Sequence, residues 1–126
     1  MPRPVHFEVH ATDPERAITF YATVFEWCFE RWGDRPYWLI STGQGPGIDG
    51  GLVPREGPPP EDDAPVNAFA VTLAVDDVDL TTRHVEQAGG TVVMPRSAIP
   101  GVGWLAYCKD TEGNVFGVLQ SDQDAA

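Results

Sequence analysis

The sequence predicts an α+β fold built from two modules of the same design. One strand, one helix and three further strands occur in the same order twice along the 126 residues. A segment rich in proline, glycine and acidic residues, at 55–66, separates the two occurrences. Each occurrence is about 55 residues long, which is small for an independent core. We therefore expect modules at 1–54 and 67–120, followed by a tail at 121–126, to form one structural domain.

The first module begins with a strand in which apolar and polar residues alternate from Val5 to His10. The segment Thr12-Asp13-Pro14-Glu15 then has the form of a capping box with proline in the first helical turn. This pattern predicts a helix to about Phe25. Three strand-like segments follow, broken by turn-forming residues, near Cys28–Trp32, Tyr37–Thr42 and Ile48–Val53.

The second module repeats this order. A strand is predicted at Phe69–Val75, Asp77 can cap the next helix, and Gly89-Gly90 ends that helix. The acidic segment at 110–114 suits a tight turn between the last two strands. The three closing strands are predicted at Thr91–Met94, Trp104–Cys108 and Asn114–Leu119.

The charge balance excludes several classes of partner. Eight Lys and Arg residues against 19 Asp and Glu residues give a net charge of −11. Such a protein repels nucleic acid and anionic membranes, so neither is an expected partner. We find no membrane-spanning apolar run and no signal peptide, so we expect a cytoplasmic protein. The two cysteines have no metal-binding spacing and are expected to be reduced, partly buried thiols.

Several short motifs accompany the repeated order of elements. They are His6-Phe7-Glu8-Val9, Asp13-Pro14-Glu15-Arg16-Ala17, Phe20-Tyr21, Val75-Asp76-Asp77-Val78-Asp79, Ala88-Gly89-Gly90 and Asp110-Thr111-Glu112-Gly113-Asn114-Val115-Phe116. Together they resemble the vicinal oxygen chelate superfamily, which contains glyoxalase I, the bleomycin and fosfomycin resistance proteins and the extradiol dioxygenases. The stretch at 103–107 and the strand at 115–120 look closest to the subgroup related to lactoylglutathione lyase. The resemblance covers Val5 to Leu119 and implies a half-open barrel around a central cleft, usually in a homodimer.

Strand alternation predicts which side chains reach such a cleft, because successive residues point to opposite faces of a sheet. In the first strand the apolar set faces the helix, and His6, Glu8 and His10 form the opposite set. His6 and Glu8 are the candidate catalytic residues. The predicted ligand-pocket residues are His6, Glu8, His10, Trp38, Thr72, Trp104, Cys108 and Gly117.

The resemblance also raises the question of a metal ion. Metal-binding relatives place one His or Glu in each first strand and one donor, commonly Glu, in each last strand. His6 matches the first position and Asp49 is a possible second ligand, whereas Ala70 and Gly117 have no donor atom. His6, Glu8 and His10 stand about 7 Å apart in succession along the strand, too far to reach one ion together. We therefore favour no metal; a divalent Zn, Ni, Mn or Fe ion on His6 and Asp49 is the alternative.

Two functions remain open. The favoured one is metal-free binding of a small organic, aromatic-containing molecule in the cleft, because Ala70 and Gly117 lack donor atoms. The alternative is a metal-dependent lyase, isomerase or dioxygenase of the glyoxalase I type. A metal-free reaction with Glu8 as the base and His6 as its partner is also possible. Tryptophans that could stack on a flat ligand, or pack in the core, are Trp27, Trp32, Trp38 and Trp104.

Overall fold

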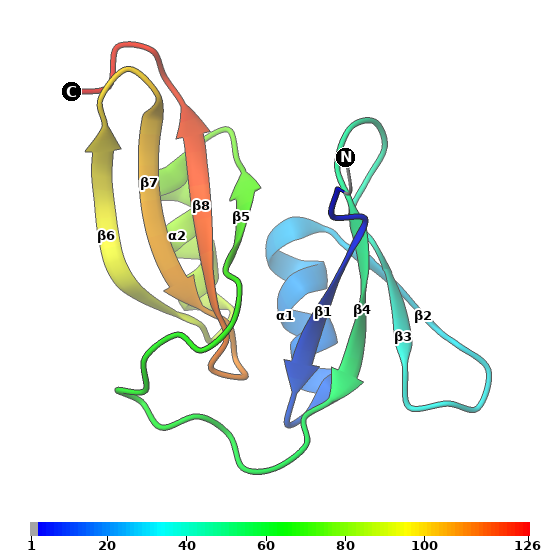
Figure 1. Ribbon diagram of the computed structural model, residues 1–126. Helices are drawn as coiled ribbons and strands as arrows, with labels where there is room; N and C mark the ends of the chain where they lie inside the picture. Colours follow the sequence, from blue (N-terminus) through cyan, green and yellow to red (C-terminus); the bar gives the residue numbers. More distant parts are fainter. Residues whose placement is uncertain (1–2) are drawn as a thin grey trace. The chain divides into compact units, whose positions relative to one another are not determined.

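The computed structural model describes residues 3–126, which form two compact units. The first unit is Met1–Pro59 and the second is Pro60–Ala126, so the division falls inside the proline- and acid-rich segment. Each unit contains one four-stranded mixed sheet and one helix that packs against it (Figure 1). The repeated βαβββ order predicted from the sequence is confirmed.

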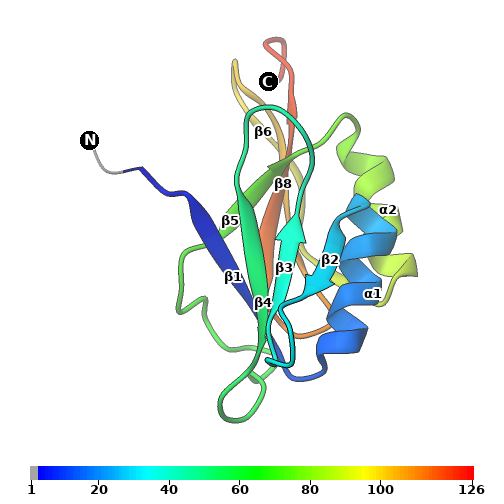
Figure 2. The same ribbon diagram turned by 90° about the vertical axis from the view of Figure 1, so that its right-hand side faces the viewer.

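The sheet of the first unit has the strand order β1-β4-β3-β2. The first strand, β1, is parallel to β4, and the remaining pairs are antiparallel. Figure 2 shows α1 along one side of this sheet, so the opposite side is its open face. The elements are β1 (His6–Ala11), α1 (Pro14–Phe25), β2 (Cys28–Arg31), β3 (Trp38–Ser41) and β4 (Asp49–Pro54).

The first helix begins where the sequence predicts. Asp13 accepts a hydrogen bond from the backbone N–H of Arg16 at 3.2 Å, which satisfies one of the free donors of the first turn. The helix buries Phe20 and Tyr21, and Tyr21 stacks on Trp27 with ring centroids 4.8 Å apart. Trp27 therefore belongs to the core of this unit.

The second unit repeats this architecture with the strand order β5-β8-β7-β6. Its first strand, β5, is again parallel to the last strand, β8, while β6, β7 and β8 pair in antiparallel fashion. The elements are β5 (Val71–Ala74), α2 (Val78–Gln87), β6 (Thr91–Ile99), β7 (Gly103–Lys109) and β8 (Val115–Ser121).

The strands of the second unit differ from the prediction at their boundaries, as β6 and β5 illustrate. Strand β6 continues past Met94 and through Pro95, which is tolerated because β6 lies at the sheet edge and its pairing with β7 shifts register there. Strand β5 begins only at Val71. Phe69, predicted as its first residue, therefore precedes the strand, and its side chain is fully exposed.

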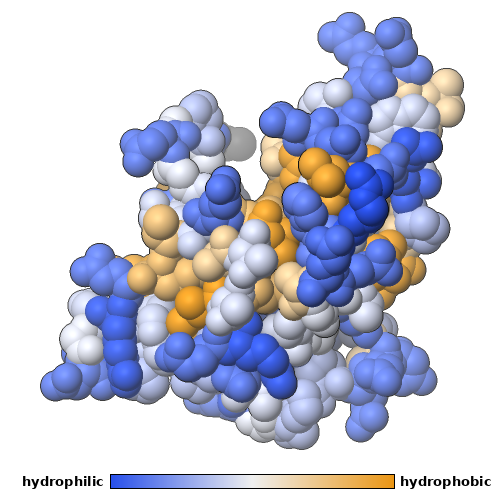
Figure 3. All heavy atoms as spheres, turned by 180° about the vertical axis from the view of Figure 1, so that it is seen from behind, coloured by the Kyte–Doolittle hydropathy of each residue, from blue (hydrophilic) through white to orange (hydrophobic). Residues whose placement is uncertain are grey.

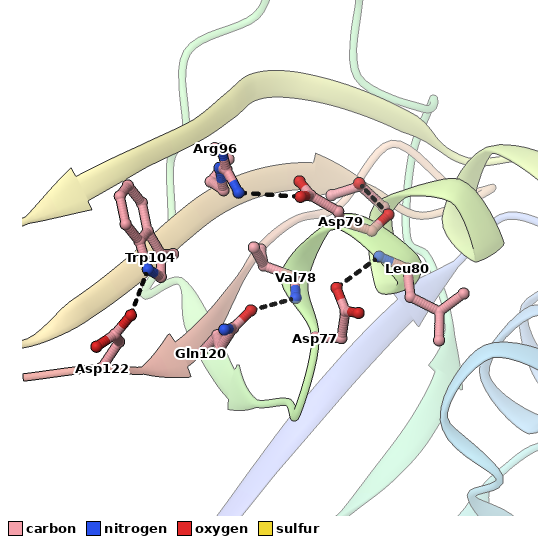
Figure 4. Close-up of polar contacts among 9 residues, drawn as sticks. Asp77, Val78, Asp79, Leu80, Arg96, Trp104, Gln120 and Asp122 are labelled. Atoms are coloured by element: carbon pink, nitrogen blue, oxygen red, sulfur yellow. Dashed lines mark hydrogen bonds and ion pairs between the residues drawn. The ribbon is translucent and has the colours of Figure 1, made fainter. Parts of the chain in front are cut away.

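Polar contacts fix the start of α2 against the sheet (Figure 4). Asp77 accepts from the backbone N–H of Leu80 at 3.0 Å and caps the helix, as predicted. The side-chain oxygen of Gln120, in β8, accepts from the N–H of Val78 at 2.9 Å. The helix start is thus anchored to the last strand by a backbone donor that would otherwise be unpaired.

The surface carries mainly hydrophilic residues on the face seen in Figure 3, with apolar residues exposed between them. Within residues 3–126, every helix is too short or too polar to cross a membrane.

The two cysteines are in different environments. Cys108 is fully buried. Burial, followed by the nearby charge of Glu86 in α2, raises the pKa of the Cys108 thiol to about 11. Cys28 is exposed, contrary to the expectation that both thiols are partly buried.

We predict that iodoacetamide modifies the native protein at Cys28 alone, because the reactive thiolate of Cys108 is both buried and disfavoured. Cys108 should react only after unfolding in denaturant. Mass spectrometry of intact protein measures the number of adducts, and Cys28→Ser is the control. Rapid modification of native Cys28→Ser protein would contradict the placement of Cys108.

Candidate functional site

The open face of the first sheet gathers the polar residues that alternation predicted. His6, Glu8 and His10 are exposed on β1, while Val9 between them is buried. The backbone of Glu8 pairs with Gly51 in β4, and Gly51 pairs with Leu39 in β3. Because paired residues share a face, the open face presents Glu8, the bare backbone of Gly51 and the side chain of Leu39 side by side.

Tyr37 is the residue that organises this face. It precedes β3, and its ring lies so close over Gly51 that a Cβ atom at position 51 would overlap the ring and the hydroxyl oxygen. The ring therefore crosses β4 and brings the hydroxyl to β1. There the Tyr37 Oη donates to Glu8 Oε2 at 3.1 Å and lies 2.9 Å from His6 Nε2. Since the phenol has one proton, His6 Nε2–H is the donor to the Tyr37 oxygen.

The electrostatics of this group keep the tyrosine neutral. Burial, the hydrogen bond to Glu8 and the Glu8 charge together raise the pKa of Tyr37 above its ordinary 10.0. His10 Nε2 lies 3.8 Å from Glu8 Oε1, beyond hydrogen-bond distance. The arrangement offers a neutral phenol, an imidazole and a carboxylate on one surface, which can exchange hydrogen bonds with a ligand.

Sequence reasoning missed Tyr37 as a site residue. Its role depends on which residue of β4 lies beneath the ring, and that register is not visible in the alternation of a single strand. The available signal was Gly51, since a glycine inside a strand often marks a close approach by another group. Trp32 extends the same face, because its ring lies 5.8 Å from that of Tyr37 at an interplanar angle of 71°.

The predicted pocket position of Trp38 is corrected by the sheet register. Trp38 pairs with Leu52, which is completely buried on the side of α1. The guanidinium of Arg31 lies over its ring at 5.3 Å. Trp38 therefore lies on the helix side of the first sheet, opposite Tyr37.

The predicted pocket residues of the second sheet lie on both faces. Thr72 and Gly117 pair on the face away from α2, where a Cβ atom at Gly117 would lie 2.8 Å from Thr72 Oγ1 and 3.2 Å from Tyr107 Cε1. Trp104 and Cys108 instead share the face of the buried Phe116 and Val118; their pairing partners in β8 are Gln120 and Phe116. The prediction that Trp104 and Cys108 line the pocket is therefore wrong, because both lie on the helix side of the second sheet.

Trp104 is held in place by polar contacts on the helix side (Figure 4). Its indole Nε1–H donates to Asp122 Oδ2 at 2.9 Å. The guanidinium of Arg96 lies 4.8 Å from the ring centroid and also pairs with Asp79 of α2 at 3.0 Å. These contacts make Trp104 a structural residue of the second unit.

Comparison with known proteins agrees with this architecture. The model of the Glyoxalase/Bleomycin resistance protein/Dioxygenase superfamily matches residues 3–118. The chain belongs to this superfamily. Nothing in the comparison selects the lactoylglutathione-lyase subgroup within it.

Individual relatives of this glyoxalase-superfamily chain are distant. CFP32 of Mycobacterium bovis is 27% identical over 122 residues, which cover 92% of the chain but only 44% of CFP32. A glyoxylase-like domain-containing protein of Didymella fabae is 30% identical over 115 residues and 88% of each chain. The solved structure of SA1046 from S. aureus has a TM-score of 0.71 at 25% identity and covers 95% of this chain and 98% of its own.

The residues of this superfamily member do not fit the metal site that the family implies. Among residues 3–126, no three His, Cys, Asp or Glu side chains are grouped so that they could hold an ion. His6 Nε2 is hydrogen-bonded to Tyr37. Asp49 Oδ1 accepts from the backbone N–H of Thr42 at 2.9 Å and from its hydroxyl at 3.1 Å. A larger residue at position 117 would collide with Thr72.

We predict that Gly51→Ala displaces the Tyr37 ring and breaks both hydrogen bonds of its hydroxyl. The free energy of unfolding should fall by about 1–3 kcal/mol, as for other overpacked sites. Urea denaturation measures this loss. In a Tyr37→Ala background the added methyl group has room, so the further loss should be below about 0.5 kcal/mol. An equal loss in both backgrounds would contradict the contact between Tyr37 and Gly51.

Proposed function

We propose that this protein binds a small organic, aromatic-containing molecule on the open face of the first sheet, without a metal ion. The observation that carries the proposal is the position of the Tyr37 hydroxyl, bonded to both His6 and Glu8 above Gly51. A hydroxyl held in this way presents an oriented hydrogen-bonding group and an adjacent aromatic ring, which suits recognition of an organic ligand.

The surroundings of Tyr37 favour an aromatic ligand in particular. Trp32 is 53% exposed and lies against Tyr37, and Leu39 on the same face is 43% exposed. Exposed apolar side chains next to fixed polar groups are typical of small-molecule sites. A flat ring can cover these side chains while its polar substituents reach His6 and Glu8.

The metal-dependent lyase, isomerase or dioxygenase is less well supported. It requires several converging donor atoms, and the two side chains that match the ligand pattern are already bonded, His6 to Tyr37 and Asp49 to Thr42. Loading an ion on Nε2 of His6 would require Tyr37 to give up its hydrogen bond.

Metal titration tests the first part of this proposal. We expect no stoichiometric metal in untagged protein by elemental analysis. Addition of Ni²⁺, Zn²⁺, Mn²⁺ or Fe²⁺ should leave the thermal midpoint of unfolding unchanged in both wild type and His6→Ala. Near-stoichiometric metal that is lost in His6→Ala would overturn the proposal of metal-free binding and favour the metal-dependent enzyme instead.

A ligand screen tests the second part. Aromatic metabolites that raise the midpoint of wild-type protein should bind about three- to tenfold more weakly to Tyr37→Phe, the effect of losing one hydrogen bond. Tyr21→Phe, which changes a buried tyrosine of α1 on the helix side of the same unit, is the matched control and should bind normally. Ligands that bind both variants equally well would place the site elsewhere.

A further inference from the structure

We propose that the ligand of this open face is an aromatic acid, whose carboxylate is bound by the guanidinium of Arg35 on the indole of Trp32. This inference rests on the proposed function, because it assigns a chemical class to the ligand of the same surface. It is argued from the turn between β2 and β3 and from the charges around it.

The turn holds Arg35 beside the site. The backbone N–H of Arg35 bonds to the carbonyl of Trp32 at 3.2 Å, and the N–H of Trp32 bonds to the carbonyl of Tyr37 at 2.9 Å. Gly33, with φ at 60°, supplies the left-handed residue that such a tight turn needs. The guanidinium carbon of Arg35 then lies 5.1 Å from the centroid of the Trp32 ring, within the range of a cation–π contact.

These residues form one continuous row across the sheet. Arg35 lies over Trp32, Trp32 lies edge-on to Tyr37, and the Tyr37 hydroxyl reaches His6 and Glu8. A ring placed against Trp32 and Tyr37 would therefore have a cation at one end. Hydrogen-bonding groups would lie at the other.

Arg35 differs from the two other arginines that stack on tryptophans, Arg31 and Arg96, because their guanidinium groups bind acceptors within the protein. Arg31 lies over Trp38, but its Nε donates to the carbonyl of Arg35 at 3.1 Å. Arg96 lies over Trp104 and pairs with Asp79. Within the part of the chain that the structure describes, the Arg35 guanidinium has neither a side-chain acceptor nor an ion pair.

A stacked guanidinium of this kind suits a carboxylate. Stacking uses the flat face of the group and leaves its N–H edge to bind two oxygen atoms. Glu8 and Glu30 lie on the same open face, so an anionic group is favoured beside Arg35 and disfavoured beside these carboxylates. The net charge of −11 repels a doubly charged phosphate more than a singly charged carboxylate.

Two probes of the same size and shape test the inference: indole-3-acetate and its neutral amide, indole-3-acetamide. Binding is followed by nuclear magnetic resonance at the indole N–H of Trp32, assigned with Trp32→Phe. We expect wild type to bind the acid about tenfold more tightly than the amide, as for one charge-assisted hydrogen-bonded pair.

Arg35→Gln should lose this preference. Arg16→Gln, the matched control, removes the same charge from α1 on the helix side of the same unit, and should keep the preference. Spectra of both variants without ligand confirm that each is folded.

Equal binding of acid and amide by wild type, or an equal loss of preference in both variants, would overturn the inference. The proposed function would stand in that case, since both probes bind. Failure of both probes to shift the Trp32 signal would overturn the proposed function together with the inference.

Discussion

The site depends on the contact between the Tyr37 ring and the backbone of Gly51. Only a residue without a side chain lets the ring cross β4 and bring its hydroxyl to β1. Once there, the hydroxyl binds His6 and Glu8, which strand alternation has already placed on one face. Because Gly51 has no side chain, Tyr37 can link the start of β3 across β4 to His6 and Glu8 of β1.

The same contact supports the proposal that the site of this superfamily member binds its ligand without a metal ion. His6 occupies the position expected of a ligand, but its Nε2 is bonded to Tyr37, and Asp49 holds its own loop through Thr42. The chain keeps the glyoxalase fold, and the side chains of His6 and Asp49 form hydrogen bonds within the protein. This illustrates that function follows from the groups at the site, and that the fold alone does not determine it.

Much of the fold was predictable because its signals are local. Asp13 and Asp77 cap their helices as the sequence indicates, and the exposed set on β1 follows from alternation within one strand. The errors arise where neighbouring strands decide the outcome. Alternation predicts Trp38, Trp104 and Cys108 in a pocket, but their pairing with β4 and β8 puts them on the helix sides. The reach of Tyr37 over Gly51 is likewise a property of paired strands.

The most direct test of this account is the ionisation of Tyr37, followed by the ultraviolet absorbance of tyrosinate. Comparison with Tyr37→Phe assigns its titration among the three tyrosines of the chain. We predict a pKa above 10.0 that falls part of the way back in Glu8→Gln, because burial, the largest cause, remains.

Because the folded pKa is raised, Tyr37 contributes stability below pH 10.0 that is lost as the pH rises through the folded pKa. A Tyr37 pKa at or below 10.0 that is unchanged in Glu8→Gln would contradict the contact on which the proposed site is built.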